Sequence, residues 1–147
     1  MGICITAKYK GAPALDGSYS MLHRIRSRLA LAWDVEFGEH YKNLTSIWSE
    51  DQYKDFNLRT SKILEQERFS EEDIDLVECW FMSDESGKVN YKTCKKLADL
   101  LMFAITDKTK PFVYCSLRYQ AYSKNDWEDL LTLLKGCYSH RSNLIWS

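Results

Sequence analysis

The stretch that decides the fold covers residues 79–101 and reads CWFMSDESGKVNYKTCKKLADLL. Apolar residues at helical spacing stand on both sides of a short polar loop, which predicts a helix, a tight turn and a second helix. Gly87 occupies the sharp point of the loop, where glycine accepts backbone conformations that other residues resist. We expect the other helices of the chain to pack on this unit.

Five helices are predicted from apolar residues that recur every three or four positions and from capping residues at the helix starts. They cover about residues 18–41, 50–66, 70–81, 90–103 and 123–136. The expected caps of the last four are Ser49, Ser70, Asn90 and Ser123, and Gly38 is expected to weaken the end of the first. The expected inward residues are Ile74, Val77, Trp80 and Phe81 before the central loop, Cys94, Leu97, Ala98 and Leu101 after it, and Trp127, Leu130, Leu131 and Leu134 in the last helix.

Short strands are predicted at residues 3–9, at residues 112–119 and in the tail after residue 142, because β-branched and aromatic residues gather there. The fold class is therefore α+β, with a single domain over residues 1–147. We expect a mostly helical domain of four to five helices with a small sheet of two or three strands.

Composition limits the classes of function. The chain has 147 residues with 45% hydrophobic and 28% charged side chains, which is ordinary for a globular protein with one core. Its 5 Trp, 9 Tyr and 6 Phe serve either core packing or a binding surface with aromatic anchors. The net charge of −1, without an acidic or basic block, argues against a general nucleic-acid-binding protein.

The sequence also predicts a compartment. The N-terminus lacks the pattern of a secretory signal, and no apolar run approaches the ~20 residues of a membrane span. The 5 cysteines are scattered and form no C-x-x-C pair, which argues against a disulfide framework or a zinc ribbon. We expect a cytoplasmic protein without membrane contact and without a cofactor.

Residues 82–93 can be aligned with a twelve-residue calcium-binding loop that has glycine at its sixth position. Calcium needs carboxylates at the first and last positions of that loop, which are Met82 and Thr93 here. We therefore expect no metal site. The loop is predicted to be structural instead, with its turn formed by Asp84, Ser86 and Gly87.

The same segment resembles a loop of small uncharacterised phage and bacterial proteins, whose pattern is close to H-S-D-C-D-G-E/K-L/I followed by a helical cysteine. The matching residues are Ser83, Asp84, Gly87, Val89, Cys94, Leu97 and Ala98, with Tyr19, Arg26, Leu29 and Ala30 upstream. Three positions differ: Met82, Glu85 and Ser86. The resemblance covers about a quarter of the chain; it implies a phage or prophage origin and one compact domain, and supplies no activity.

Two clusters are candidates for binding. In the first, Arg26 falls on the apolar face of the first helix, with Tyr19 and His23 nearby. Its guanidinium is expected either to pair with a carboxylate or extend to solvent, or to line a pocket and meet an anionic ligand. The second cluster is Arg118, Tyr119, Tyr122 and Lys124, extended by Tyr138, His140 and Arg141. It predicts either ordinary surface charge or a nucleobase and phosphate site.

The chain contains no nucleophile elbow, P-loop, H-E-x-x-H or dinucleotide-binding motif, so no catalytic residue is predicted. The leading hypothesis is a non-enzymatic, phage-type binding protein that engages a host protein, for example to inhibit host immunity. One alternative is a protein that binds or sequesters a small nucleotide-like anion. Another is a small enzyme of unknown class.

Overall fold

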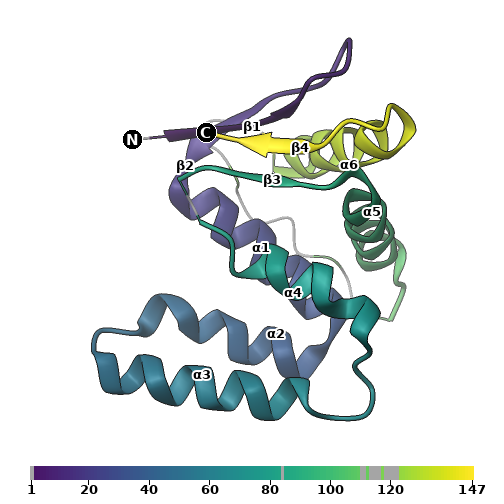
Figure 1. Cartoon of the computed structure of the whole chain (residues 1–147). Coiled ribbons are helices and arrows are strands. Elements are labelled where there is room, and N and C mark those ends of the chain that lie inside the picture. Colours follow the sequence, from purple (N-terminus) through teal and green to yellow (C-terminus); the bar gives the residue numbers. More distant parts are fainter. Residues whose placement is uncertain (1, 84, 110–111, 113–116, 118–122) are drawn as a thin grey trace.

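The computed structural model describes residues 2–83, 85–109, 112, 117 and 123–147. These residues form six α-helices, two short 3-10 helices and a four-stranded antiparallel sheet (Figure 1). The α+β class is therefore confirmed, with one helix and one strand more than the upper limits predicted. Among these helices, none combines the length and the apolar character needed to cross a lipid bilayer.

The sheet brings the two ends of the chain together, with strand order β2-β1-β4-β3. Its strands are β1 (Gly2–Ala7), β2 (Leu15–Ser18), β3 (Gly87–Val89) and β4 (Leu144–Trp146). The predictions for β1 and for the tail are confirmed, whereas β2 and β3 lie in segments where no strand was predicted. The strand predicted at residues 112–119 falls mostly outside the described residues.

The sheet buries one face against the helices. Along β1, alternate residues Ile3, Ile5 and Ala7 are buried, because successive side chains of a strand point to opposite faces. Figure 1 shows α1, α4, α5 and α6 on this side of the sheet and the α2–α3 pair farthest from it.

The single helix predicted for residues 18–41 is wrong, because it divides into α1 (Tyr19–Trp33) and α2 (Val35–Tyr41). Asp34 between them is extended, with φ −156° and ψ 125°. Its carboxylate accepts a hydrogen bond from the Phe37 backbone N–H at 2.9 Å and so caps α2. The cap makes a new helix start more favourable than continuation of the old one.

Gly38 lets α2 fold back closely on α1. A Cβ atom at Gly38 would lie 2.4 Å from the Cα of Leu31. The sequence suggested that this glycine weakens the end of a helix, but its position at the contact shows a packing role.

Helix α3 (Glu50–Leu64) follows the 3-10 helix η1 (Lys42–Ser46) and forms a hairpin with α2. As predicted, Ser49 caps it, since its hydroxyl accepts from the Gln52 backbone N–H at 3.2 Å. The helix has two buried side chains, Phe56 and Ile63. The hairpin therefore projects from the body of the molecule (Figure 1).

The buried stripe predicted before the central loop is wrong in most positions. The 3-10 helix η2 (Glu71–Asp73) precedes α4 (Ile74–Trp80), and the predicted cap at Ser70 is present as a capping box. The buried residues of α4 are Leu76, Cys79 and Trp80. Ile74, 52% exposed, and Phe81, 40% exposed, face solvent because the helix face with Leu76, Cys79 and Trp80 packs into the core instead.

The second half of the central unit agrees with its prediction. Asn90 caps α5 (Tyr91–Thr106) by accepting from the Lys92 backbone N–H at 2.8 Å. The inward residues Cys94, Leu97, Ala98 and Leu101 are all buried. In α6 (Ser123–Ser139), the buried apolar residues are Trp127, Leu130, Leu133, Leu134 and Cys137, and the predicted Leu131 is only partly buried.

Candidate functional site

Charged residues are distributed unevenly between two parts of the fold. Residues 34–85 carry 15 Asp and Glu against 5 Lys and Arg, a net charge of −10. Residues 1–33 and 86–147 carry 6 Asp and Glu against 15 Lys and Arg, a net charge of +9. We refer to these as the acidic part and the basic part. The near-zero total charge thus hides two surfaces of opposite sign.

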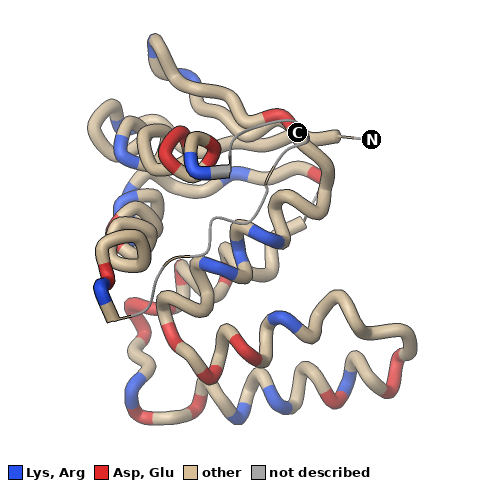
Figure 2. The backbone as a smooth tube through the Cα atoms, turned by 180° about the vertical axis from the view of Figure 1, so that it is seen from behind, with Lys and Arg blue, Asp and Glu red and all other residues tan. Residues whose placement is uncertain are grey.

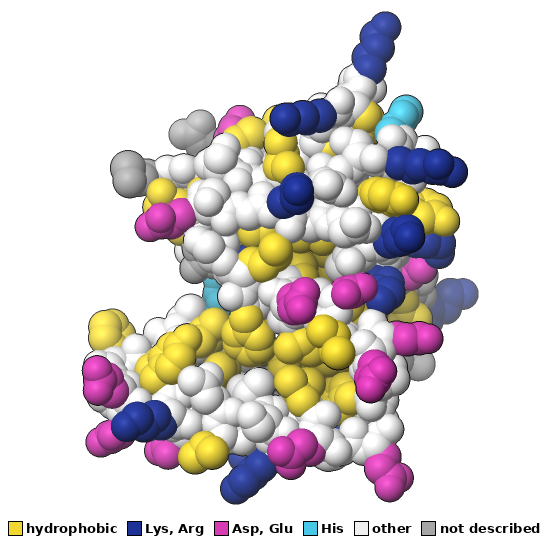
Figure 3. Space-filling view, viewed as in Figure 1, with side chains coloured by type: hydrophobic (Ala, Val, Ile, Leu, Met, Phe, Trp, Pro, Cys, Tyr) yellow, Lys and Arg dark blue, Asp and Glu magenta, His cyan; other side chains and the backbone are white. Residues whose placement is uncertain are grey.

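The figures show this separation. In Figure 3, most acidic side chains surround the lower half of the molecule and most basic ones lie on the upper half. In Figure 2, seen from behind, Lys and Arg residues also follow α1. Each part therefore attracts partners of the opposite charge. The net charge of the whole chain does not reveal this separation.

Helix α4 presents an apolar stripe at the surface of the acidic part. Ile74 and Phe81 are exposed and Val77 between them is half-buried. These residues repeat at the spacing of a helix face, while the carboxylates of Asp75 and Glu78 lie beside them. The stripe has the pattern of a core-facing surface, but solvent covers much of it.

The stripe continues onto α3 through Phe81. The Phe81 ring lies 5.7 Å from the ring of Tyr41 and 6.3 Å from that of Phe56, measured between centroids. Tyr53, one helical turn before Phe56, is 50% exposed. We define the α4–α3 surface as Ile74, Asp75, Val77, Glu78, Phe81 and Tyr53. Figure 3 shows a hydrophobic band between α4 and the hairpin, with acidic side chains along its rim.

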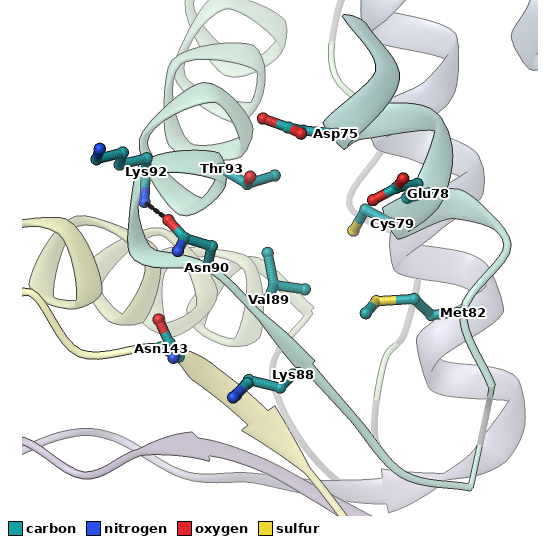
Figure 4. Close-up of a pocket in the computed structure, with 10 residues that line it drawn as sticks. All are labelled: Asp75, Glu78, Cys79, Met82, Lys88, Val89, Asn90, Lys92, Thr93 and Asn143. Atoms are coloured by element: carbon teal, nitrogen blue, oxygen red, sulfur yellow. Dashed lines mark hydrogen bonds between the residues drawn. The ribbon is translucent and has the colours of Figure 1, made fainter.

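A pocket of about 460 Å³ lies beside α4, where the acidic and basic parts meet (Figure 4). It is lined by Asp75, Glu78, Cys79, Met82, Lys88, Val89, Asn90, Lys92, Thr93 and Asn143. In Figure 4, Glu78, Cys79 and Met82 point from one side toward Thr93 and Val89 on the other. Among the described residues, the side chains of Glu78, Lys88 and Thr93 have no hydrogen-bond or ion-pair partner.

The pocket contains a cysteine but lacks an activated one. Burial raises the pKa of the Cys79 thiol to about 11, and the nearby charge of Arg26 only partly opposes this. The thiol is therefore protonated at neutral pH and is a weak nucleophile. Within the described part of the chain, no group of three His, Cys, Asp or Glu side chains could hold a metal ion. The pocket can offer hydrogen bonds and charges to a polar ligand.

Arg26, predicted on the apolar face of the first helix, is 4% exposed. Its Nη2 lies 3.5 Å from the Ser83 carbonyl oxygen, and its Cζ lies 5.5 Å from the centroid of the Trp146 ring. The side chain lines an internal cavity of about 30 Å³ among core residues. Arg26 thus connects α1 with the central loop and β4.

The neighbours predicted for Arg26 lie elsewhere on α1. The His23 ring stacks on Tyr41, with centroids 5.5 Å apart, and its Nε2 lies 3.2 Å from the Ser27 hydroxyl. Tyr19 is partly buried against the core. The structure places neither Tyr19 nor His23 in the lining of the pocket beside α4 or of the cavity at Arg26.

The remaining predicted site residues divide into two groups. Arg118, Tyr119, Tyr122 and Asp84 lie outside the described residues. Ser86 is exposed, and Gly87 opens β3.

Sequence reasoning missed Glu78, Lys88 and Thr93 as pocket residues. Glu78 comes from α4, Lys88 from β3 and Thr93 from α5, so only packing brings them together. The signal for the α4–α3 surface was present in the helical period of Ile74, Val77 and Phe81. It was assigned to the core because an apolar helix stripe usually lies there.

Comparisons with known proteins identified no relative of this chain. The chain matches no protein-family model, no curated protein and no solved structure. The resemblance of the central segment to small phage and bacterial proteins therefore stays an expectation, and any function must be argued from this chain's own surfaces.

Proposed function

We propose that this chain is a non-enzymatic binding protein that engages a basic segment of a partner protein through the α4–α3 surface. The observation that carries the proposal is the solvent-exposed apolar stripe of α4. It has the period of a buried helix face, and it lies between carboxylates in a part of the chain with a net charge of −10. A partner with apolar side chains flanked by Lys and Arg matches both features.

The energetics favour binding through a few anchors. Burial of an apolar side chain contributes about 1.5–3 kcal/mol, and aromatic residues dominate many interfaces. Phe81 and Tyr53 are 40% and 50% exposed, so each still has apolar area to bury. Asp75 and Glu78 beside the stripe would speed association with a basic partner and fix its register.

The resemblance of the central segment supports a bacterial host protein as the partner, including a protein of host immunity. A cytoplasmic site of action accords with that proposal. We expect the partner to present a basic surface that also carries apolar side chains.

The test compares capture of bacterial proteins by the wild-type chain and by surface variants. We expect Ile74→Ser and Glu78→Lys each to weaken capture of the same partner by about tenfold. The matched control is Leu58→Ser, because Leu58 is 61% exposed on α3 but lies outside the α4–α3 surface. This control should capture the partner as the wild type does.

Affinity for the captured partner should also fall as NaCl rises from about 50 to 300 mM, because salt screens opposite charges. The proposal is wrong if the Leu58 and Ile74 variants lose the partner equally. It is also wrong if Glu78→Lys leaves both affinity and salt dependence unchanged.

A further inference from the structure

A groove of about 780 Å³ lies in the basic part, between the first turns of α5 and the end of α6. It is lined by Tyr91, Lys92, Lys95, Lys96, Asp99, Tyr138, Ser139 and Arg141. Four of these side chains are cationic and one is anionic, so the lining has a net charge of +3. The groove is open to solvent and has room for more than a lone inorganic anion.

Two of the four cations already have partners. Lys95 pairs with Asp99 at 3.0 Å. Lys96 lies 3.5 Å from the Asp75 carboxylate and donates to the Glu72 carbonyl at 2.8 Å. The side chains of Lys92 and Arg141 have no ion pair or hydrogen bond with any described residue, and both are exposed. These two cations remain available for a ligand.

Arg141 has a backbone conformation that favours glycine. It is the only non-glycine residue with positive φ in the described chain, at 50°. Its N–H donates to the Tyr138 carbonyl at 3.3 Å, and the Ser142 N–H donates to the Cys137 carbonyl at 2.9 Å. These two bonds are those of a helix end closed by a left-handed residue, a position usually taken by glycine.

An arginine at this position costs backbone free energy relative to glycine. A favourable contact of the side chain can offset this cost. The guanidinium has no partner among the described residues, and it borders a cationic groove. An ion pair with an anion bound in the groove would supply such a contact.

The groove also has an aromatic wall. Tyr138 is 44% exposed, and the Lys95 ammonium lies over one face of its ring, 5.7 Å from the centroid. An exposed ring beside cations can stack a planar ligand group while the cations hold a phosphate.

We propose that this groove binds a phosphate-bearing ligand with a planar ring, of the nucleoside monophosphate class. Arg141 and Lys92 hold the phosphate, and Tyr138 stacks on the ring. The groove lies in the basic part and shares no residue with the α4–α3 surface, although its Lys96 pairs with Asp75 of that surface.

Calorimetric titration of the whole chain with AMP, inorganic phosphate and adenosine tests the site. We expect AMP to bind most tightly, phosphate more weakly and adenosine most weakly. Arg141→Gly should lower AMP affinity by about tenfold, because a charged hydrogen bond is lost. The same substitution should raise the thermal midpoint, because glycine relieves the left-handed conformation.

These opposite changes separate a lost ligand contact from a damaged fold. Tyr138→Leu should weaken AMP and leave phosphate affinity unchanged, and Lys135→Ala, an exposed α6 lysine outside the groove lining, should change neither. The proposal is overturned if AMP at about 5 mM gives no binding, if Arg141→Gly binds AMP like the wild type, or if phosphate binds as tightly as AMP.

Discussion

Arg26 and Trp146 meet at one carbonyl group, although they are far apart in the sequence. The Trp146 Nε1–H donates to the Ser83 oxygen at 3.0 Å, and Arg26 Nη2 lies 3.5 Å from the same oxygen. The guanidinium lies over the Trp146 ring at 5.5 Å. This contact joins α1, the loop after α4 and the last strand. The fold thus uses a buried cation to fix the central loop on the sheet.

We predict that Arg26→Ala destabilises the fold by about 2 kcal/mol, because buried groups around a charged donor lose their partner. Arg28→Ala, on the same helix but only partly buried, should cost less than about 0.5 kcal/mol. Urea unfolding of both variants measures the difference. Equal stability of the two variants would contradict this role of Arg26.

Gly87 should tolerate no side chain. A Cβ atom there would lie 2.1 Å from Cζ2 of Trp146, its partner across β3 and β4. The sequence predicts either a positive φ or a tight packing contact at Gly87; its φ is not positive, and the close contact with Trp146 explains the glycine. Gly87→Val is expected to cost more than about 1 kcal/mol, because Trp146 must move. Lys88→Val, an exposed site in the same strand, is the control and should be nearly neutral in thermal unfolding.

His40 should make the hairpin sensitive to acid. Its ring stacks on Phe56 at 4.2 Å, and Nε2 lies 2.7 Å from the Thr60 hydroxyl. Burial, with the charge of Arg59, lowers the pKa of His40. In the unfolded chain the pKa of this histidine is about 6.5, so the unfolded state binds the proton more readily than the folded state. Stability is full above that pH and falls as the pH drops toward the lower folded pKa.

Thermal midpoints between about pH 8 and pH 5 measure this effect, with His40→Gln as the control that cannot titrate. The wild type should lose stability over this range and the variant should lose less. Hydrogen bonds from Arg68 lower the pKa of Asp34 and of Glu36, so their contribution is lost only below about pH 4, outside this window. Identical pH profiles for the two proteins would refute the assignment to His40.

The central loop should not bind calcium with biological affinity. The last position of the calcium alignment is Thr93, which is buried in the first turn of α5, and Met82 occupies the first. Neither supplies the carboxylate that calcium needs. Calorimetric titration with calcium should show no binding tighter than about 1 mM. Micromolar binding would overturn this prediction.

Predictions that depend on neighbouring residues agree best with the structure. Ser49 and Asn90 were expected as caps because a short polar side chain meets free N–H groups within its own turn, and both make that bond. The inward set of α5 follows in the same way from a single helical period. These features depend on contacts between residues that are close together in the sequence, so the sequence alone is enough to predict them.

Two predictions failed because they depend on distant residues. The break at Asp34 is stabilised by Arg68, whose Nε lies 2.7 Å from the Asp34 carboxylate, and the sequence shows no link between them. The apolar stripe of α4 was expected in the core, but the residues buried there are Leu76, Cys79 and Trp80. Which stripe of a short helix is buried depends on the surfaces that pack against it.

The sequence by itself determined the class of the fold, most helix starts and the inward face of α5, because caps, turns and periods act over one or two turns of chain. Tertiary structure alone decided the rest. It separated the charges of a nearly neutral chain into two parts, buried Arg26 against Trp146, and assembled a groove from α5 and the end of α6. Such features arise when segments tens of residues apart become neighbours.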